Sequence, residues 1–460
     1  MVSDSRPRVP RLLVATLAAG TLLNPLNSSM IAVALVQLQE AFSIGVGTVT
    51  WLISGFYVAA AVGQPLMGRL VDQFGARRLF MAGLVLVLLT SAAMPFVPNF
   101  WWLVALRAVQ ALGTSTAYPA ALVLIRAATP GKDAPAGAMG ILAMAGSTSA
   151  ALGPVIGGVL VSLAGWQAVF LVNVPFTLVG LLLASRTLPR TTPDRADTGP
   201  RFRGLLAEID LPGIALFTMT LVSVLLFLLS FSTEPRWWCL PIFLLGLVAL
   251  IIRERAVPTP FLDVRGLAAN PALTSVLVQQ ATIQLVFYCA FFSLPMWLES
   301  VREFETAAAG AFVLPIAGLG VLTIPLAARL IDRRGSRAAL VLGSVVLLTA
   351  TIGMQVLDDA TPILVIVGFM VLFGIPNGFN NLGLQTALYT ATPASRTGSS
   401  GGLFQTFRYL GAISATAVIG MIFENDLTSA GLHRLGLVMS AGAIVVLVLA
   451  LTIRRHRVDA

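Results

Sequence analysis

The chain has 460 residues, of which 57% are hydrophobic and only 11% carry a charged side chain. A soluble domain has about twice that charged fraction, so the composition excludes an ordinary soluble protein and predicts an integral membrane protein. The net charge of +9 does not indicate nucleic-acid binding, because the basic residues lie in short stretches between apolar runs, as topology signals do.

The apolar runs are about 20 residues long, the length that an α-helix needs to cross a bilayer. We therefore predict an all-α integral membrane protein with fourteen transmembrane helices. The first run is too long for the apolar part of a signal peptide, so we expect an uncleaved first span. The expected spans are 12–38, 49–68, 79–98, 101–125, 138–162, 168–185, 211–232, 237–252, 272–298, 308–328, 338–357, 362–389, 398–423 and 435–453.

An internal repeat divides these spans into two halves. The segment 65–78 (PLMGRLVDQFGARR) and the segment 325–338 (PLAARLIDRRGSRA) share Pro, Leu, Arg, Leu, Asp, Gly and Arg in the same register. We therefore expect two six-helix bundles with two inserted central helices. The predicted divisions are an N-terminal bundle (1–185), a cytoplasmic linker (186–210), two inserted helices (211–252), a cytoplasmic loop (253–271) and a C-terminal bundle (272–460).

The orientation follows from the basic residues. Most of the 29 Lys and Arg residues lie in the two tails and in alternate loops, whereas the opposite loops hold Arg236, Arg302 and Arg434. Basic loops stay on the cytoplasmic side. We therefore expect a multi-pass protein of the cell (plasma) membrane with both termini in the cytoplasm.

A glycine-rich stretch, 146–158 (GSTSAALGPVIGG), lies inside the fifth predicted span. Gly146, Gly153 and Gly157 fall on one helical face, which would let a second helix approach closely. Pro154 removes a backbone bond and is expected to bend the helix. The spacing, which ends in Gly157 and Gly158, resembles the antiporter motif of exporters in the major facilitator superfamily. A packing face without a transport role is the alternative.

The first copy of the repeat resembles the most widespread signature of that superfamily. The resemblance implies a cytoplasmic latch that helps to hold one state of the transport cycle, and the alternative is a simple topological anchor of basic residues. The gating residues implied are Gly68, Asp72, Gly75, Arg77 and Arg78 in the first copy and Asp332, Gly335 and Arg337 in the second.

Three further stretches resemble the fourteen-span drug:proton antiporter family within this superfamily. They are 106–113 (LRAVQALG), 166–176 (WQAVFLVNVPF) and 397–420 (TGSSGGLFQTFRYLGAISATAVIG). The first contains Arg107, which we expect to face the bundle interior because a charge within a span is costly. The alternative is an arginine whose charged end reaches the outer interface.

The first span departs from this family. Its usual Leu-Asp-x-Thr-x-x-Asn-x-Ala-Leu pattern corresponds to 26–35 (LNSSMIAVAL), with Asn27 at the acidic position. No Asp, Glu or His lies in the middle of a predicted span, so a buried proton carrier is not evident. The proton-coupling candidates are Glu299 and Glu424, which lie at the outer ends of spans.

Polar residues recur at helical spacing in several spans, together with aromatic residues. Facing polar stripes suit an amphipathic ligand between the two halves, although hydrogen bonds between helices would explain single Asn and Gln residues equally well. The substrate-binding candidates are Asn27, Arg107, Gln110, Gln280, Gln284, Tyr288, Asn377, Asn381, Gln385 and Arg408.

These features predict an efflux transporter of small amphipathic molecules, of the drug or antibiotic type, that exchanges substrate for protons by alternating access. The alternatives are a porter for an organic anion or metabolite, and a membrane sensor that kept the fold without transport. An enzyme is not expected, since no span carries a cluster of Asp, Glu, His or Cys and no GxxxxGK[ST] motif occurs. We expect no cofactor, no metal and no nucleic acid; the partners are the substrate, protons and the lipid bilayer.

Overall fold

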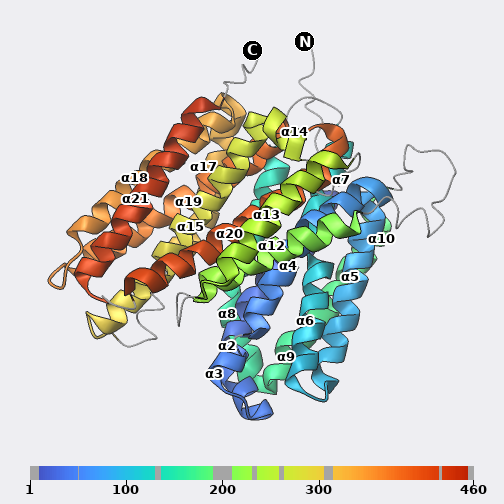
Figure 1. The fold of residues 1–460 in the computed structure, drawn as a ribbon, viewed down its shortest axis with the longest axis horizontal. Coiled ribbons are helices and arrows are strands. Elements are labelled where there is room, and N and C mark those ends of the chain that lie inside the picture. Colours follow the sequence, from blue (N-terminus) through green and yellow to red (C-terminus); the bar gives the residue numbers. More distant parts are fainter. Residues whose placement is uncertain are drawn as a thin grey trace. The chain divides into compact units, whose positions relative to one another are not determined.

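The structure is a computed structural model in which regular structure is entirely helical over the described residues (Figure 1). These residues are 10–49, 51–129, 136–189, 210–230, 236–257, 264–304, 314–423 and 427–453. Most of the predicted linker 186–210, and the candidate Glu424, lie outside them.

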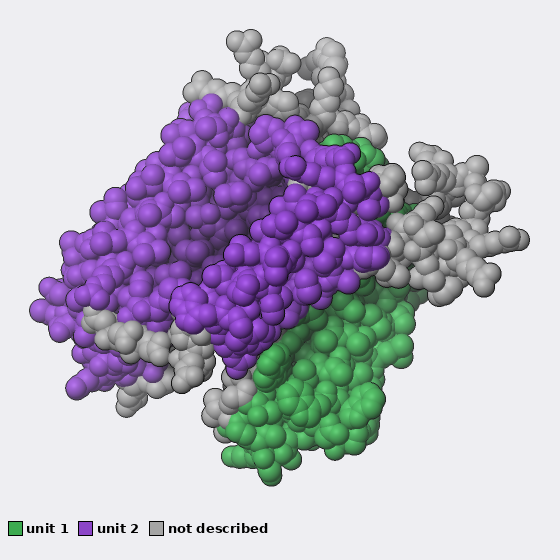
Figure 2. All heavy atoms as spheres, viewed as in Figure 1, with its two compact units in different colours: residues 1–209, 392–406 green, residues 210–391, 407–460 purple. Residues whose placement is uncertain are grey.

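The chain divides into two compact units, which Figure 2 colours separately. Unit 1 comprises residues 1–209 and 392–406, and unit 2 comprises residues 210–391 and 407–460. The inserted helices therefore group with the C-terminal half, and a short segment from the C-terminal half groups with unit 1.

Unit 1 contains ten α-helices among its described residues, two short 3₁₀ helices and the beginning of α20. They are α1 (Arg11–Thr21), α2 (Leu23–Phe42), α3 (Val46–Val49), α4 (Trp51–Phe74), α5 (Ala76–Ala93), η1 (Met94–Phe96), α6 (Phe100–Thr114), α7 (Ala117–Ala128), α8 (Ala136–Ala164), α9 (Trp166–Leu171), α10 (Asn173–Thr187), η3 (Ala394–Arg396) and α20 (Thr397–Phe423).

Unit 2 contains the rest of α20 and the remaining described helices. They are α12 (Leu211–Ser230), α13 (Cys239–Ala256), α14 (Val264–Ala269), α15 (Pro271–Ser300), α17 (Leu314–Arg334), α18 (Ser336–Gly353), η2 (Met354–Val356), α19 (Ile363–Ala391) and α21 (Ser429–Thr452).

Each of the fourteen predicted spans overlaps one helix or a consecutive pair of helices. Within the described ranges, eight helical segments are long and apolar enough to cross a membrane. The chain is therefore a multi-pass membrane protein, and the count of fourteen spans stays a prediction.

Proline explains three of the breaks that divide predicted spans into two helices. The breaks at Leu22, Ser115–Thr116 and Val172 each precede a proline by three or four residues, namely Pro25, Pro119 and Pro175. Proline has no N–H to donate to the carbonyl four residues earlier, so the helical ladder loses a bond at that point.

Each unit has its own apolar core. In unit 1, Met30 and Leu38 of α2 pack with buried residues of neighbouring helices, among them Leu103 of α6 and Phe170 of α9. In unit 2, the largest buried side chain is that of Trp297 on α15, which packs with residues of α18, α19 and α21. Leucine, isoleucine and valine also remain exposed on outer helix faces, as expected for helices whose solvent is lipid.

Both copies of the repeat form the same turn. Gly75 joins α4 to α5 with φ of 91°, and Gly335 joins α17 to α18 with φ of 79°. Positive φ is costly for residues with a Cβ atom. The glycine that the two copies share is therefore explained by a local backbone requirement.

Candidate functional site

The first copy of the repeat contacts the beginning of α20 within unit 1. The Asp72 carboxylate, near the end of α4, accepts bonds from the backbone N–H groups of Gly398 (2.7 Å) and Ser399 (2.8 Å). The Ser399 hydroxyl donates a third bond at 2.6 Å. The first N–H groups of a helix lack partners within the helix and favour an anion, so this carboxylate caps α20.

The backbones of α4 and α20 approach closely at this point because both carry glycine. A Cβ atom on Gly68 would lie 2.3 Å from the carbonyl oxygen of Gly398, and a Cβ on Gly398 would lie 2.5 Å from the carbonyl oxygen of Gly68. Nearby, Arg126 of α7 donates to the Thr397 hydroxyl at 2.8 Å. This last bond joins two residues that are 271 positions apart in the sequence.

The remaining residues of the two copies behave differently. Arg77 donates to the Ser185 carbonyl oxygen of α10 at 3.1 Å, and Arg78 is exposed. In the second copy, Asp332 is exposed and no described residue of the chain forms a hydrogen bond or ion pair with it. The sequence repeat is thus not matched by a repeat of the contact within unit 2.

Arg107 lies in the interior of unit 1. Its side chain is only 1% exposed, so its charged end does not reach an interface. It donates to the backbone oxygen of Asn27 (2.5 Å) and to the side-chain oxygen of Gln110 (2.6 Å), and its guanidinium lies 4.3 Å from the centre of the Phe56 ring. Carbonyl dipoles and an aromatic face therefore stabilise the charge.

The polar contacts extend from Arg107 to two further helices. Gln110 donates to the Ser91 hydroxyl of α5 at 2.8 Å, and Asn173 of α10 donates to the side-chain oxygen of Asn27 at 2.8 Å. Asn173 and Ser91 are not among the candidates predicted from the sequence. Asn173 belongs to the Trp166–Phe176 stretch, so its place in that motif was the available signal.

The glycine face of α8 contacts α2 over part of its predicted length. A Cβ atom on Gly153 would lie 1.7 Å from the Ser29 hydroxyl oxygen and 2.7 Å from its Cβ, and one on Gly157 would lie 2.8 Å from the Met30 carbonyl oxygen. For Gly146, no atom of the described residues lies within 4 Å of the corresponding position. Among the described residues, α2 therefore lies against Gly153 and Gly157 but not against Gly146.

In unit 2, the polar candidates lie on α15, α19 and α20. Gln280 and Gln284 are 1% and 5% exposed. Gln385 donates to the side-chain oxygen of Asn381 at 2.7 Å, and because both residues belong to α19 this bond does not join two helices. Asn377 packs beside Gly320 of α17, and Arg408 is partly buried.

Aromatic rings form a cluster along α15. Phe287 and Phe291 stack with ring centres 5.7 Å apart, and Tyr288 and Phe292 stack at 5.6 Å. Phe287 and Tyr288 also meet edge to face at 5.3 Å. The cluster follows Gln284 on the same helix, so amide and aromatic side chains are consecutive there.

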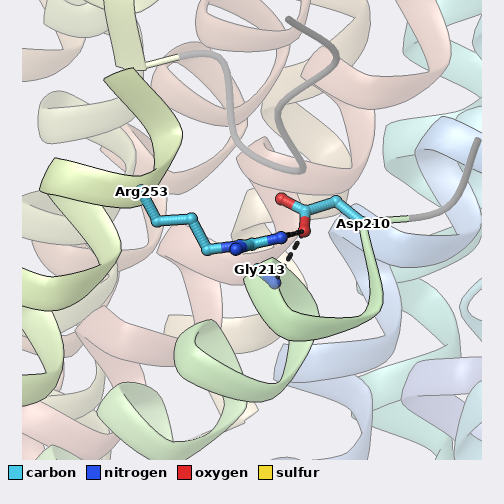
Figure 3. A network of polar contacts seen from close by, with 3 residues as sticks. All are labelled: Asp210, Gly213 and Arg253. Carbon is cyan, nitrogen blue, oxygen red and sulfur yellow. Dashed lines mark hydrogen bonds and ion pairs between the residues drawn. The ribbon is translucent and has the colours of Figure 1, made fainter. Parts of the chain in front are cut away.

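Two buried acidic residues, Asp210 and Glu254, lie at ends of the inserted helices and are not among the candidates predicted from the sequence. Asp210 precedes α12 and accepts from Arg253 of α13 (2.6 Å) and from the Gly213 backbone N–H (2.9 Å), as Figure 3 shows. Glu254, in the last turn of α13, is 1% exposed. The Asp-Leu-Pro-Gly sequence at the start of α12 is a typical helix beginning, but sequence alone did not pair it with α13. Glu299, near the end of α15, is partly buried.

A second polar cluster in unit 2 connects Arg302, which follows α15, with the segment between η2 and α19. Arg302 donates to the backbone oxygens of Asp358 (3.2 Å) and Thr361 (2.8 Å). The pKa of the Asp358 carboxyl is lowered, mainly because the Thr361 hydroxyl donates a hydrogen bond to it. Two backbone hydrogen bonds and the charge of Arg302 have smaller effects in the same direction. A ring nitrogen of His433 on α21 forms a hydrogen bond with the Leu357 backbone oxygen at 2.8 Å. The cluster therefore connects the segment after α15, the segment between η2 and α19, and α21.

Comparison with known proteins identifies the family. Residues 17–416 match the sequence profile of the family described as "Major Facilitator Superfamily". An uncharacterised MFS-type transporter of Bacillus subtilis (strain 168), YwoD, is 36% identical over 433 residues, which are 93% of each chain. The tetracenomycin C resistance and export protein of Streptomyces glaucescens is 28% identical over 91% of this chain and 78% of its own length.

A solved structure shares the fold. The crystal structure of the human organic anion transporter MFSD10 (TETRAN) matches with a TM-score of 0.68, covering 96% of this chain and 99% of that chain at 16% identity. At this identity the likeness shows the fold alone. The chain belongs to the major facilitator superfamily, and it is a transporter rather than an enzyme.

Proposed function

We propose that this transporter exports small amphipathic molecules of the drug or antibiotic type, in exchange for protons, through a fourteen-span bundle in the plasma membrane. The observation that carries the proposal is the backbone contact of α8 with α2 at Gly153 and Gly157. It occurs within the stretch that resembles the antiporter motif of exporters. The named role of the Streptomyces glaucescens relative in resistance and export supports the same direction of transport.

The proposed cycle is alternating access, in which one half of the bundle rocks against the other. The contacts of Asp72 with α20 support a gating role for the first copy of the repeat, since breaking three charge-assisted bonds would accompany any separation of these helices. A rocking motion needs surfaces with two discrete arrangements. Helix packing through glycine, as between α4 and α20, suits such a surface.

Proton coupling needs a side chain that gains and loses a proton during the cycle. In the described part of unit 1 the acidic side chains are Glu40, which is exposed, and Asp72. The interior contacts around Arg107 involve Asn, Gln and Ser, which do not titrate in the physiological range. We therefore favour carboxylates of unit 2 as carriers: Glu299 and Glu424 from the sequence, and the buried Asp210 and Glu254 from the structure.

An accumulation assay tests export and coupling together. Cells that lack their own major exporters would express the protein and be loaded with a panel of lipophilic antibiotics and dyes. We expect at least one compound to accumulate less in expressing cells, and a protonophore to remove the difference. Export that persists with the protonophore would contradict proton coupling. No difference for any compound, together with no flux in sealed vesicles, would favour the non-transporting sensor.

The topology is testable by reporter fusions in two loops. We expect a fusion at Gly199 to lie in the cytoplasm and a fusion at Asn425 to lie outside. The reason is that most of the basic residues lie in the loop that contains Gly199, in its alternate loops and in the two tails. An enzyme that is active on only one side of the membrane, fused at each position, gives the readout. The same sidedness at both positions would contradict the fourteen-span arrangement.

A further inference from the structure

Arg408 is the one charged residue of α20, which spans Thr397–Phe423. It is the twelfth residue of the helix, about 16 Å from its beginning at the helical rise. The side chain is partly buried, and no described residue of the chain forms a hydrogen bond or ion pair with it. A permanently charged guanidinium at this depth is costly unless a partner approaches it.

The contact of α20 with α15 shows which side chains lie at the same level. A Cβ atom on Gly411 would lie 2.1 Å from the Ala281 backbone oxygen and 2.9 Å from the Cβ of Gln284. Further along both helices, the Cys289 thiol contacts the Ala415 backbone oxygen at 3.9 Å. The two helices therefore run in the same direction.

This register places Gln280 at the level of Arg408. Arg408 precedes Gly411 by nearly one turn on α20, and Gln280 precedes Gln284 by one turn on α15. Positions three or four residues apart share a helix face. The side-chain oxygen of Gln280 is buried without a hydrogen-bond partner, and no described residue bonds to the amide of Gln284.

Charge in the rest of unit 2 favours one sign of ligand. The acidic residues of its described part lie at helix ends or in connections: Asp210, Glu254, Glu299, Glu303, Asp332, Asp358 and Asp359. Arg408 is thus the charge that a molecule meets midway along these helices. The amide N–H groups of Gln280 and Gln284 add hydrogen-bond donors to the five of the guanidinium.

We propose that Arg408, Gln280 and Gln284 bind the anionic group of the substrate, so that the protein selects organic anions over cations. This inference rests on the proposed transport function and names its substrate class. The carboxylate or sulfonate takes the guanidinium fork. The apolar body of the same molecule lies toward the rings of Tyr288 and Phe291, one to two helical turns further along α15, or about 6–10 Å.

Two dyes with the same xanthene frame and opposite charge test the proposal. Fluorescein is anionic at neutral pH and rhodamine 123 is cationic. Fluorescence anisotropy would measure the binding of each dye to the purified full-length protein. We expect fluorescein to bind at least ten times more tightly than rhodamine 123. Equal binding, tighter binding of rhodamine 123 or no binding of fluorescein overturns the proposal without any variant.

Substitutions then locate the site. We expect Arg408→Gln to weaken fluorescein binding at least tenfold, with a smaller loss in Arg408→Lys, which keeps the charge but not the fork. The control is Arg236→Gln, which removes the same charge from an exposed position before α13 and should leave binding unchanged. Fluorescein binding that survives Arg408→Gln, in protein that melts at the parent temperature, overturns the assignment.

Flux in proteoliposomes separates this inference from the proposed function. Binding that depends on Arg408, without transport of fluorescein or any other compound, would support the anion site and contradict export. Transport of cationic compounds that is insensitive to Arg408→Gln would support export and overturn the anion site.

Discussion

Replacing Gly153 with leucine should abolish export while leaving the protein inserted in the membrane. Even the first carbon of a side chain at this position would lie 1.7 Å from the Ser29 hydroxyl oxygen, 2.7 Å from the Ser29 Cβ and 3.3 Å from the Met30 backbone nitrogen. The hydroxyl can rotate away, but the other two atoms move only if α2 and α8 separate. Overpacking of this kind typically costs about 1–3 kcal/mol, and it would change the spacing that a rocking motion uses.

The same helix offers a matched control. Gly146 is also a glycine of α8, two turns earlier, and no described residue has an atom within 4 Å of its Cβ position. We expect Gly146→Leu to transport like the parent, and Gly153→Ala to give an intermediate loss. Initial efflux rates, normalised to the amount of protein in the membrane, give the comparison. Normal efflux by Gly153→Leu would show that the contact with α2 has no role in transport.

Changing Asp72 to asparagine should reduce transport at least tenfold. The change keeps the shape of the side chain but replaces one acceptor oxygen by an NH₂ group. Each carboxylate oxygen of Asp72 accepts from a backbone N–H of α20, one from Gly398 and the other from Ser399. In asparagine one of these donors would face another donor, and a buried donor without an acceptor costs about 1–3 kcal/mol. A change of 1.4 kcal/mol corresponds to a factor of about ten.

The second copy of the repeat provides the control for this prediction. Asp332 occupies the same motif position, is exposed and has no bond from the described part of unit 2. We expect Asp332→Asn to retain nearly the parent transport rate. The measurement is uptake of a transported compound into inverted vesicles, with folding checked by thermal unfolding in detergent. Equal losses in both variants would mean that the motif acts through something other than the contact with α20.

Comparison of Asp72 with Asp332 shows what a motif leaves open. Both acidic residues are followed by a glycine with positive φ and then by a new helix. The turn depends on nearest neighbours and could therefore be predicted from either copy. The partner could not, because the N–H groups that bind Asp72 come from residues more than 320 positions away in the sequence.

The composition and the lengths of the apolar runs by themselves determined that this is an all-α membrane protein. Backbone polar groups cannot remain unsatisfied in lipid, so long apolar segments must be helical. Each proline near a helix interruption, Pro25, Pro119 and Pro175, removes one bond from its own helix. The sequence alone did not decide which prolines interrupt a helix, because α4, α15, α17 and α19 continue through internal prolines. The family resemblance rested on residues close together in the sequence, and the comparisons confirmed it at the level of the superfamily.

The tertiary structure alone decided how deep and how crowded each candidate position is. Sequence spacing could place Arg107 on a helix, but the choice between the interior and an interface depended on Asn27 and Phe56, which belong to other helices. Gly146 and Gly153 share a helical face, and only the position of α2 distinguished them. The pairing of Asp210 with Arg253 joins two helices across 43 residues. Such contacts are set by packing between helices, which depends on side chains from several elements at once.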